Sequence, residues 1–182
     1  MIVAVYEHVV DLCLDKSVTS NLAAYYEGSY LAQLKQRLSA HAAERVTFAG
    51  LVPHSEIASY YAAADICVCP SLYESFGMSV IEAMAAGVPV VATRVGAVPQ
   101  LISDQHTGLI VNTADPKAIA SAIARLFGNA QLWSSISRSA RKQVSEQYSW
   151  DTICTRLHEL YSGLLCSDSR ILDRHARGVH GA

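Results

Sequence analysis

Residues 66–93 of this 182-residue chain read ICVCPSLYESFGMSVIEAMAAGVPVVAT. Two apolar runs, 66–69 and 88–92, enclose a loop and a longer apolar segment, which predicts the order strand, loop, helix, strand. Gly87 lies where the helix should end, and Pro89 prevents the helix from continuing. This order places Glu74 in the loop before the helix and Glu82 inside the helix.

Glu74 and Glu82 are unexpected neighbours for a helix N-terminus. The first N–H groups of a helix lack partners and the macrodipole is positive there, so this end attracts anions. Two carboxylates would repel a bare phosphate at that position. A ligand that carries hydroxyl groups on both sides of a phosphate removes the conflict, because carboxylates accept strong hydrogen bonds from hydroxyl groups. A nucleotide-sugar is such a ligand.

Further along the chain, short apolar strands alternate with helical segments. We expect strands near 46–49, 90–93 and 108–111, and helices near 29–41, 55–64, 116–127, 132–147 and 150–165. Such alternation predicts an α/β fold, with a parallel sheet that carries helices on both faces. Ligands bind such sheets at the carboxyl ends of the strands, where the loops 50–53, 70–77 and 93–96 should converge.

The expected domain spans residues 27–165. Residues 1–26 are poorly defined, and 9–14 fit a strand or a helix equally well. Residues 166–182 are polar and lack periodicity, so we expect a disordered tail.

Composition excludes several classes of function. The formal net charge is −2 and no Lys/Arg cluster occurs, so we expect no nucleic-acid partner. No apolar stretch is long enough to span a bilayer, and the N-terminus is a poor signal peptide. The five cysteines form no Cys-x-x-Cys pair, so we expect no metal site and a reducing, cytoplasmic environment. Cys67 and Cys69 should share one face of a strand and pack as small apolar groups.

From about Glu27 to Leu165 the chain resembles the C-terminal, donor-binding half of a GT-B glycosyltransferase. It is most similar to the large retaining family 4, also called group 1. The resemblance rests on the order and spacing of four segments, which are 45–50, 62–65, 70–92 and 107–111. It implies a Rossmann-like parallel sheet, incomplete at its N-terminus, and transfer of a hexosyl group from a nucleotide diphosphate sugar without a metal cofactor.

The resemblance also implies roles for individual residues. Glu74 would be the catalytic-site carboxylate that binds hydroxyl groups of the transferred sugar, and Glu82 would bind the ribose. The remaining donor-binding positions would be Gly28, Leu51, Val52, Ser75, Phe76, Gly77 and Met78. The acceptor, a carbohydrate or a lipid-linked sugar, would be bound by an N-terminal half that this chain lacks. Polysaccharide biosynthesis would be the setting, and peripheral membrane contact stays open.

The sequence departs from the family pattern in the charges around the phosphate. The Arg and Lys that neutralise the donor pyrophosphate would lie upstream, the paired glycines are Gly96-Ala97, and an expected acidic residue is Gln100. We therefore expect the chain alone to be inactive. The alternatives are a non-catalytic module that binds nucleotide or another protein chain and, less favoured, a nucleotide-sugar epimerase.

Several of these residues also have simpler interpretations. Glu74 could be a solvated loop residue, and Glu82 could pair with Arg94. Gly96 could serve a turn or a close approach of two backbones. Tyr60 and Tyr61 are best explained as helix packing.

Overall fold

The fold is that of a computed structural model, which describes residues 2–4, 29–49 and 52–178. Within these residues four parallel strands form one sheet in the order β1-β2-β3-β4. The strands are β1 (Ile2–Ala4), β2 (Ile66–Cys69), β3 (Val90–Thr93) and β4 (Leu109–Val111). Every residue of β2 and β3 is buried, which accounts for their continuous apolar sequences.

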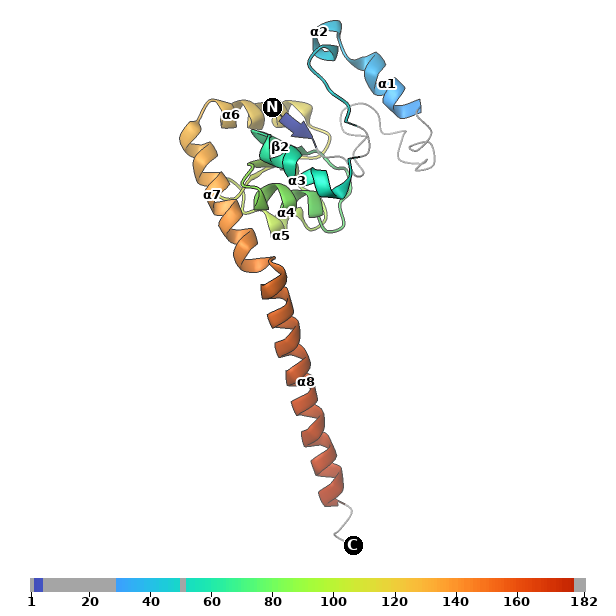
Figure 1. Cartoon of the computed structure of the whole chain (residues 1–182), viewed down its shortest axis with the longest axis vertical. Coiled ribbons are helices and arrows are strands. Elements are labelled where there is room, and N and C mark those ends of the chain that lie inside the picture. Colours follow the sequence, from blue (N-terminus) through green and yellow to red (C-terminus); the bar gives the residue numbers. More distant parts are fainter. Residues whose placement is uncertain (1, 5–28, 50–51, 179–182) are drawn as a thin grey trace.

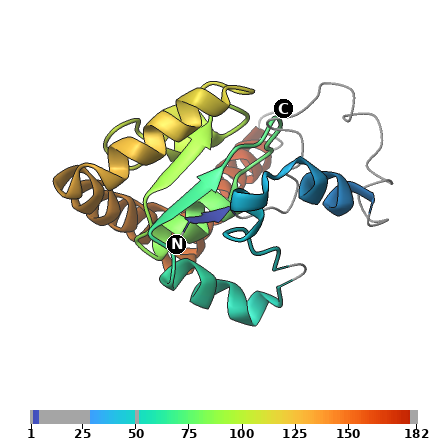
Figure 2. The same ribbon diagram turned by 90° about the horizontal axis from the view of Figure 1, so that it is seen from above.

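Helices cover both faces of this sheet, as Figure 2 shows for α3 and α6. The described helices are α1 (Ser29–Arg37), α2 (Ala40–Ala43), α3 (His54–Ala62), α4 (Met78–Ala85), α5 (Val98–Leu101), α6 (Pro116–Phe127), α7 (Ala130–Gln147) and α8 (Trp150–Gly178). One core contains Cys67, Val90 and Ala92 together with residues of α4 and α5. The other contains Val68, Val91 and Leu109 together with residues of α6. The predicted α/β fold is therefore confirmed.

The start of the chain differs from the prediction. Residues 2–4 form β1, which pairs in parallel with β2 from Ile2 opposite Ile66 to Ala4 opposite Val68. The expected strand at 46–49 does not form, and Val46 and Phe48 are exposed. The backbone N–H and C=O groups on both edges of β2 need hydrogen-bond partners, and β1 and β3 supply them. No edge of β2 is therefore left for residues 46–49 to pair with.

The end of the chain also differs from the prediction. We expected a disordered tail from residue 166, but α8 continues to Gly178. Residues 166–177 contain no Pro or Gly, so nothing in the backbone ends the helix before Gly178. In Figure 1 this helix projects away from the sheet.

Candidate functional site

The loop after β2 and the first turn of α4 form the centre of the candidate site. Gly77 is the N-cap residue of α4 and has a φ of 90°, a conformation that glycine adopts without strain. A side-chain oxygen of Glu74, Oε1, accepts a hydrogen bond of 3.0 Å from the Gly77 N–H. The Glu74 carboxylate therefore lies at the positive end of the helix.

A second loop fixes the backbone of this first loop. The buried Thr93 hydroxyl, at the end of β3, donates to the carbonyl oxygens of Ser71 at 2.5 Å and Cys69 at 3.4 Å. Gly96 has a φ of +49°, and a Cβ at this position would overlap the carbonyl oxygen of Glu74. Gly96 thus serves both of the predicted roles, since it lies in a turn and allows a close approach of two backbones. The predicted convergence is confirmed for the loops 70–77 and 93–96, whereas residues 50 and 51 of the third predicted loop lie outside the described residues.

Glu82 lies one turn into α4 and is half-buried. Its Oε2 accepts a hydrogen bond of 3.1 Å from the Tyr61 hydroxyl, which also lies 3.3 Å from the carbonyl oxygen of Ser79. Tyr61 is only 2% exposed, and burial, followed by the nearby Cys67 and Glu82, raises the pKa of its phenol far above the ordinary value. Packing was predicted correctly for Tyr61 but not for Tyr60, which is exposed, and the bond from Tyr61 to Glu82 was missed. A carboxylate in an apolar helix needs a partner, and that need was the available signal.

The other predicted site residues divide into three groups. Ser75, Phe76 and Met78 surround the start of α4 and are exposed, Phe76 by 48% and Met78 by 52%. Val52 is half-buried and lies two residues before α3. Gly28 and Leu51 lie outside the described residues.

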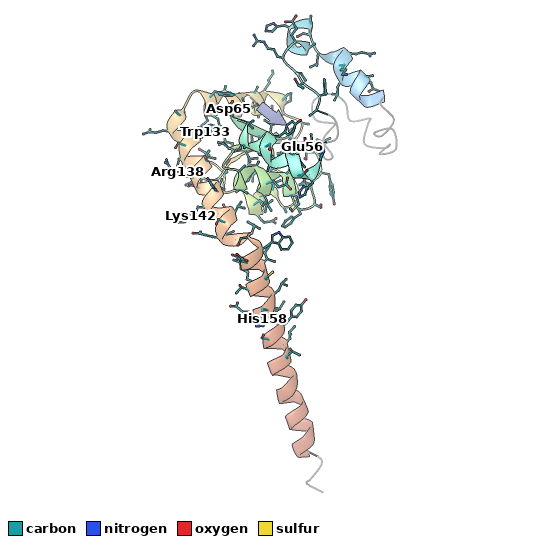
Figure 3. All side chains as sticks on the ribbon, viewed as in Figure 1. Glu56, Asp65, Trp133, Arg138, Lys142 and His158 are labelled. Atoms are coloured by element: carbon teal, nitrogen blue, oxygen red, sulfur yellow. The ribbon has the colours of Figure 1, made fainter. Side chains whose placement is uncertain are left out.

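The charges near the site are not paired with one another. Arg94 is exposed and, within the described part of the chain, forms no ion pair with Glu82 or Glu74, so the predicted Glu82–Arg94 alternative is wrong. Arg138 and Lys142 lie on α7 (Figure 3), and Lys142 Nζ is 3.9 Å from Glu146 Oε1. The candidate site is thus acidic in the part of the chain that the structure describes.

The first half of α7 packs at the opposite ends of the strands. The Trp133 indole N–H donates a hydrogen bond of 2.8 Å to the carbonyl oxygen of Asp65, directly before β2 (Figure 3). The Ser137 hydroxyl donates one of 2.6 Å to the carbonyl oxygen of Gly87, shortly before β3. These two contacts hold the amino ends of β2 and β3.

Neither a metal-binding cluster nor a membrane-spanning helix occurs within the residues that the structure describes. No group of three or more His, Cys, Asp or Glu side chains is arranged to hold a metal ion there. No described helix is both long and apolar enough to cross a membrane.

Comparison with known proteins gives the family. Residues 8–129, more than half of the chain, match the family described as Glycosyl transferases group 1. The chain belongs to this family. An uncharacterized glycosyltransferase of Methanocaldococcus jannaschii is 36% identical over 132 residues, which cover 72% of this chain and 33% of that protein. The chain therefore spans about a third of the length of this relative.

Solved structures of glycosyl transferases have the same architecture. Sucrose-phosphate synthase from Thermosynechococcus elongatus is 35% identical, with a TM-score of 0.69 over 78% of this chain and 35% of that one. Anabaena HepE in complex with UDP-glucose is 27% identical, with a TM-score of 0.70 over 76% of this chain and 38% of that one. The group 1 family and the fold, as predicted from residues 45–111, are thus confirmed.

Proposed function

We propose that this chain is the donor-binding domain of a retaining GT-B glycosyltransferase of family 4. It binds a nucleotide diphosphate sugar and presents the hexosyl group for transfer to a sugar or lipid acceptor. The observation that carries the proposal is the placement of two carboxylates on one helix start. Glu74 lies at the N-terminus of α4, and Glu82 follows one turn further along the same helix. A relative of the same architecture, HepE, was solved with UDP-glucose.

Each group has a distinct task in this proposal. The N–H groups of Phe76, Gly77 and Met78 bind the pyrophosphate, and Glu82 accepts hydrogen bonds from the ribose. The Gly77 N–H already forms a hydrogen bond to Glu74, so this bond breaks when the nucleotide-sugar binds. The pyrophosphate takes over the Gly77 N–H, and Glu74 turns to hydroxyl groups of the transferred sugar. Val52, with Leu51, lies against the base, and Gly28 approaches the donor.

Catalysis in this proposal comes from stabilising the diphosphate as it leaves. Backbone N–H groups aimed at developing negative charge typically accelerate such steps by about 10²–10³-fold for each donor. We assign no covalent nucleophile and no metal ion. The acceptor is bound by a part of the enzyme outside this chain, in the cytoplasm and in contact with a membrane where the acceptor is a lipid. We therefore expect the 182-residue polypeptide to bind a donor but transfer no sugar by itself.

Isothermal titration calorimetry with UDP, GDP, ADP and UDP-glucose tests this function. We expect saturable binding of one nucleotide, with the sugar adding affinity. Glu74→Gln should abolish the gain in affinity that the sugar provides. Glu82→Gln should weaken the binding of the nucleotide itself. Arg138→Gln on α7 is the control and should change neither. If no nucleotide binds, or if both glutamine variants bind like the unsubstituted chain, the proposal is wrong.

One observation favours a second candidate, a module that binds another protein chain. Along α8, large apolar side chains recur at the helical spacings of three, four or seven residues and are exposed: Trp150, Leu157, Leu160, Tyr161, Leu164 and Leu165. Monomeric proteins seldom expose an apolar surface of more than a few hundred Å². Failure of all nucleotides to bind, together with self-association or capture of a protein partner through α8, would favour this alternative.

A further inference from the structure

Tyr61 has a polar contact that core packing does not require. Its ring belongs to the apolar core between the sheet and α4, while its hydroxyl is 3.1 Å from Glu82 Oε2. The second acceptor within reach, the Ser79 carbonyl at 3.3 Å, belongs to the α4 backbone. Since hydrogen bonds to a charged group are the stronger kind, the single phenol proton goes mainly to the carboxylate.

The two oxygens of Glu82 therefore differ. Oε2 is held by a side chain from α3, whereas Oε1 has no hydrogen bond to another described residue. Glu82 is half-buried on the same face of α4 as the exposed Met78, four residues before it. The contact with Tyr61 thus fixes the direction of the carboxylate and leaves Oε1 without a hydrogen bond to another described residue.

We infer that Tyr61 is a positioning residue, which holds Glu82 so that Oε1 accepts from the ribose hydroxyl groups of a bound nucleotide. This inference rests on the proposed function, and it adds that the site selects ribose through a buried phenol on a neighbouring helix. A free glutamate side chain would lose conformational entropy when it binds a ligand, and Tyr61 removes that loss before binding occurs. Loss of this preorganisation should weaken nucleotide binding roughly tenfold.

The test compares ribonucleotides with nucleotides that lack the ribose hydroxyl groups. Calorimetry would measure the affinity of UDP, GDP and ADP and of their 2′,3′-dideoxy forms. The proteins are the unsubstituted chain, Tyr61→Phe, and the matched control Tyr60→Phe, which removes a hydroxyl from an exposed ring on the same helix. We expect Tyr61→Phe to bind the ribonucleotide roughly tenfold more weakly and the dideoxy form unchanged. Tyr60→Phe should alter neither.

If Tyr61→Phe weakens the binding of the ribonucleotide and of its dideoxy form equally, the role of Tyr61 is merely structural and the inference is overturned. Unchanged binding of both nucleotides would overturn it as well. A double-mutant cycle with Glu82→Gln gives a second readout that does not depend on Tyr61→Phe alone. In the Glu82→Gln background, removal of the Tyr61 hydroxyl should have almost no further effect, whereas additive losses contradict positioning. If Glu82→Gln itself binds like the unsubstituted chain, the inference about Tyr61 fails. If no nucleotide binds, the proposed function fails and the inference fails with it.

Discussion

Replacing Gly96 with alanine should separate the two loops that hold Glu74. Gly96 and Gly87 both have a positive φ, +49° and +77°. At Gly87, on the far end of α4, an added Cβ would lie 3.4 Å from the Ser137 Oγ, close to ordinary contact. At Gly96 the added Cβ would overlap the Glu74 carbonyl oxygen and lie 2.7 Å from the Glu74 carbonyl carbon.

The two variants differ in what the added methyl group meets. A left-handed conformation costs a residue other than glycine about 1–2 kcal/mol, so Gly87→Ala should lower the free energy of unfolding by this amount. Gly96→Ala carries the same cost, and in addition its loop must move until the new carbon is about 3.5 Å from Glu74. A shift of about 1 Å at a site can change its function by about a hundredfold. Gly96→Ala should therefore lose about 3 kcal/mol or more of stability and at least tenfold in nucleotide affinity.

Urea unfolding measures the first quantity, and calorimetry with the nucleotide that binds best measures the second. Gly87→Ala is the matched control and should bind the nucleotide as the unsubstituted chain does. Equal losses of stability in the two variants, with unchanged binding in Gly96→Ala, would refute the contact between Gly96 and Glu74 as the element that positions the site.

Two further predictions concern the buried hydroxyl groups. The pKa of Tyr61 lies far above its ordinary value of 10.0 in the folded chain, so above pH 10 the unfolded chain releases this proton and the folded chain keeps it. The free energy of unfolding should therefore be insensitive to Tyr61 below pH 10 and fall above it, by up to about 1.4 kcal/mol per pH unit. Chemical unfolding at several pH values should show this slope in Tyr60→Phe but not in Tyr61→Phe; the same slope in both would contradict the assignment. Thr93→Val removes a buried donor and should cost about 1–3 kcal/mol in urea unfolding, whereas the exposed Thr113→Val should cost less than about 0.5. Equal losses in the two threonine variants would mean that the Thr93 hydroxyl does not hold the loop.

Local chemistry explains which parts of the fold could be predicted. The order strand, loop, helix, strand in residues 66–93 was predicted correctly, because its signals lie within the segment itself: apolar runs, Gly77 before α4 and Gly87 after it. The predicted helix at 116–127 also has a local start signal, because the carboxylate of its N-cap residue, Asp115, accepts from the Ala118 N–H at 2.9 Å. Such contacts join residues only three positions apart.

Contacts between distant residues could not be predicted in this way. The pairing of β1 with β2 joins residues 64 positions apart, from Ile2 to Ile66, and no local pattern distinguishes it from pairing with 46–49. The bond from Tyr61 to Glu82 spans 21 positions and depends on how α3 and α4 pack. The sequence therefore predicted that Glu82 belongs to the site, but the group that orients Glu82 could be found only once the helices were placed.

The two tryptophans of the chain offer separate optical reporters. Trp133 is half-buried on α7 and hydrogen-bonded beside β2, so its emission should change when the sheet unfolds. Trp150 begins α8 and is 81% exposed, so its emission should shift to shorter wavelength when another surface covers that helix. Replacing one tryptophan with phenylalanine leaves the other as a label-free signal. The variant that keeps Trp133 then reports unfolding, and the variant that keeps Trp150 reports association.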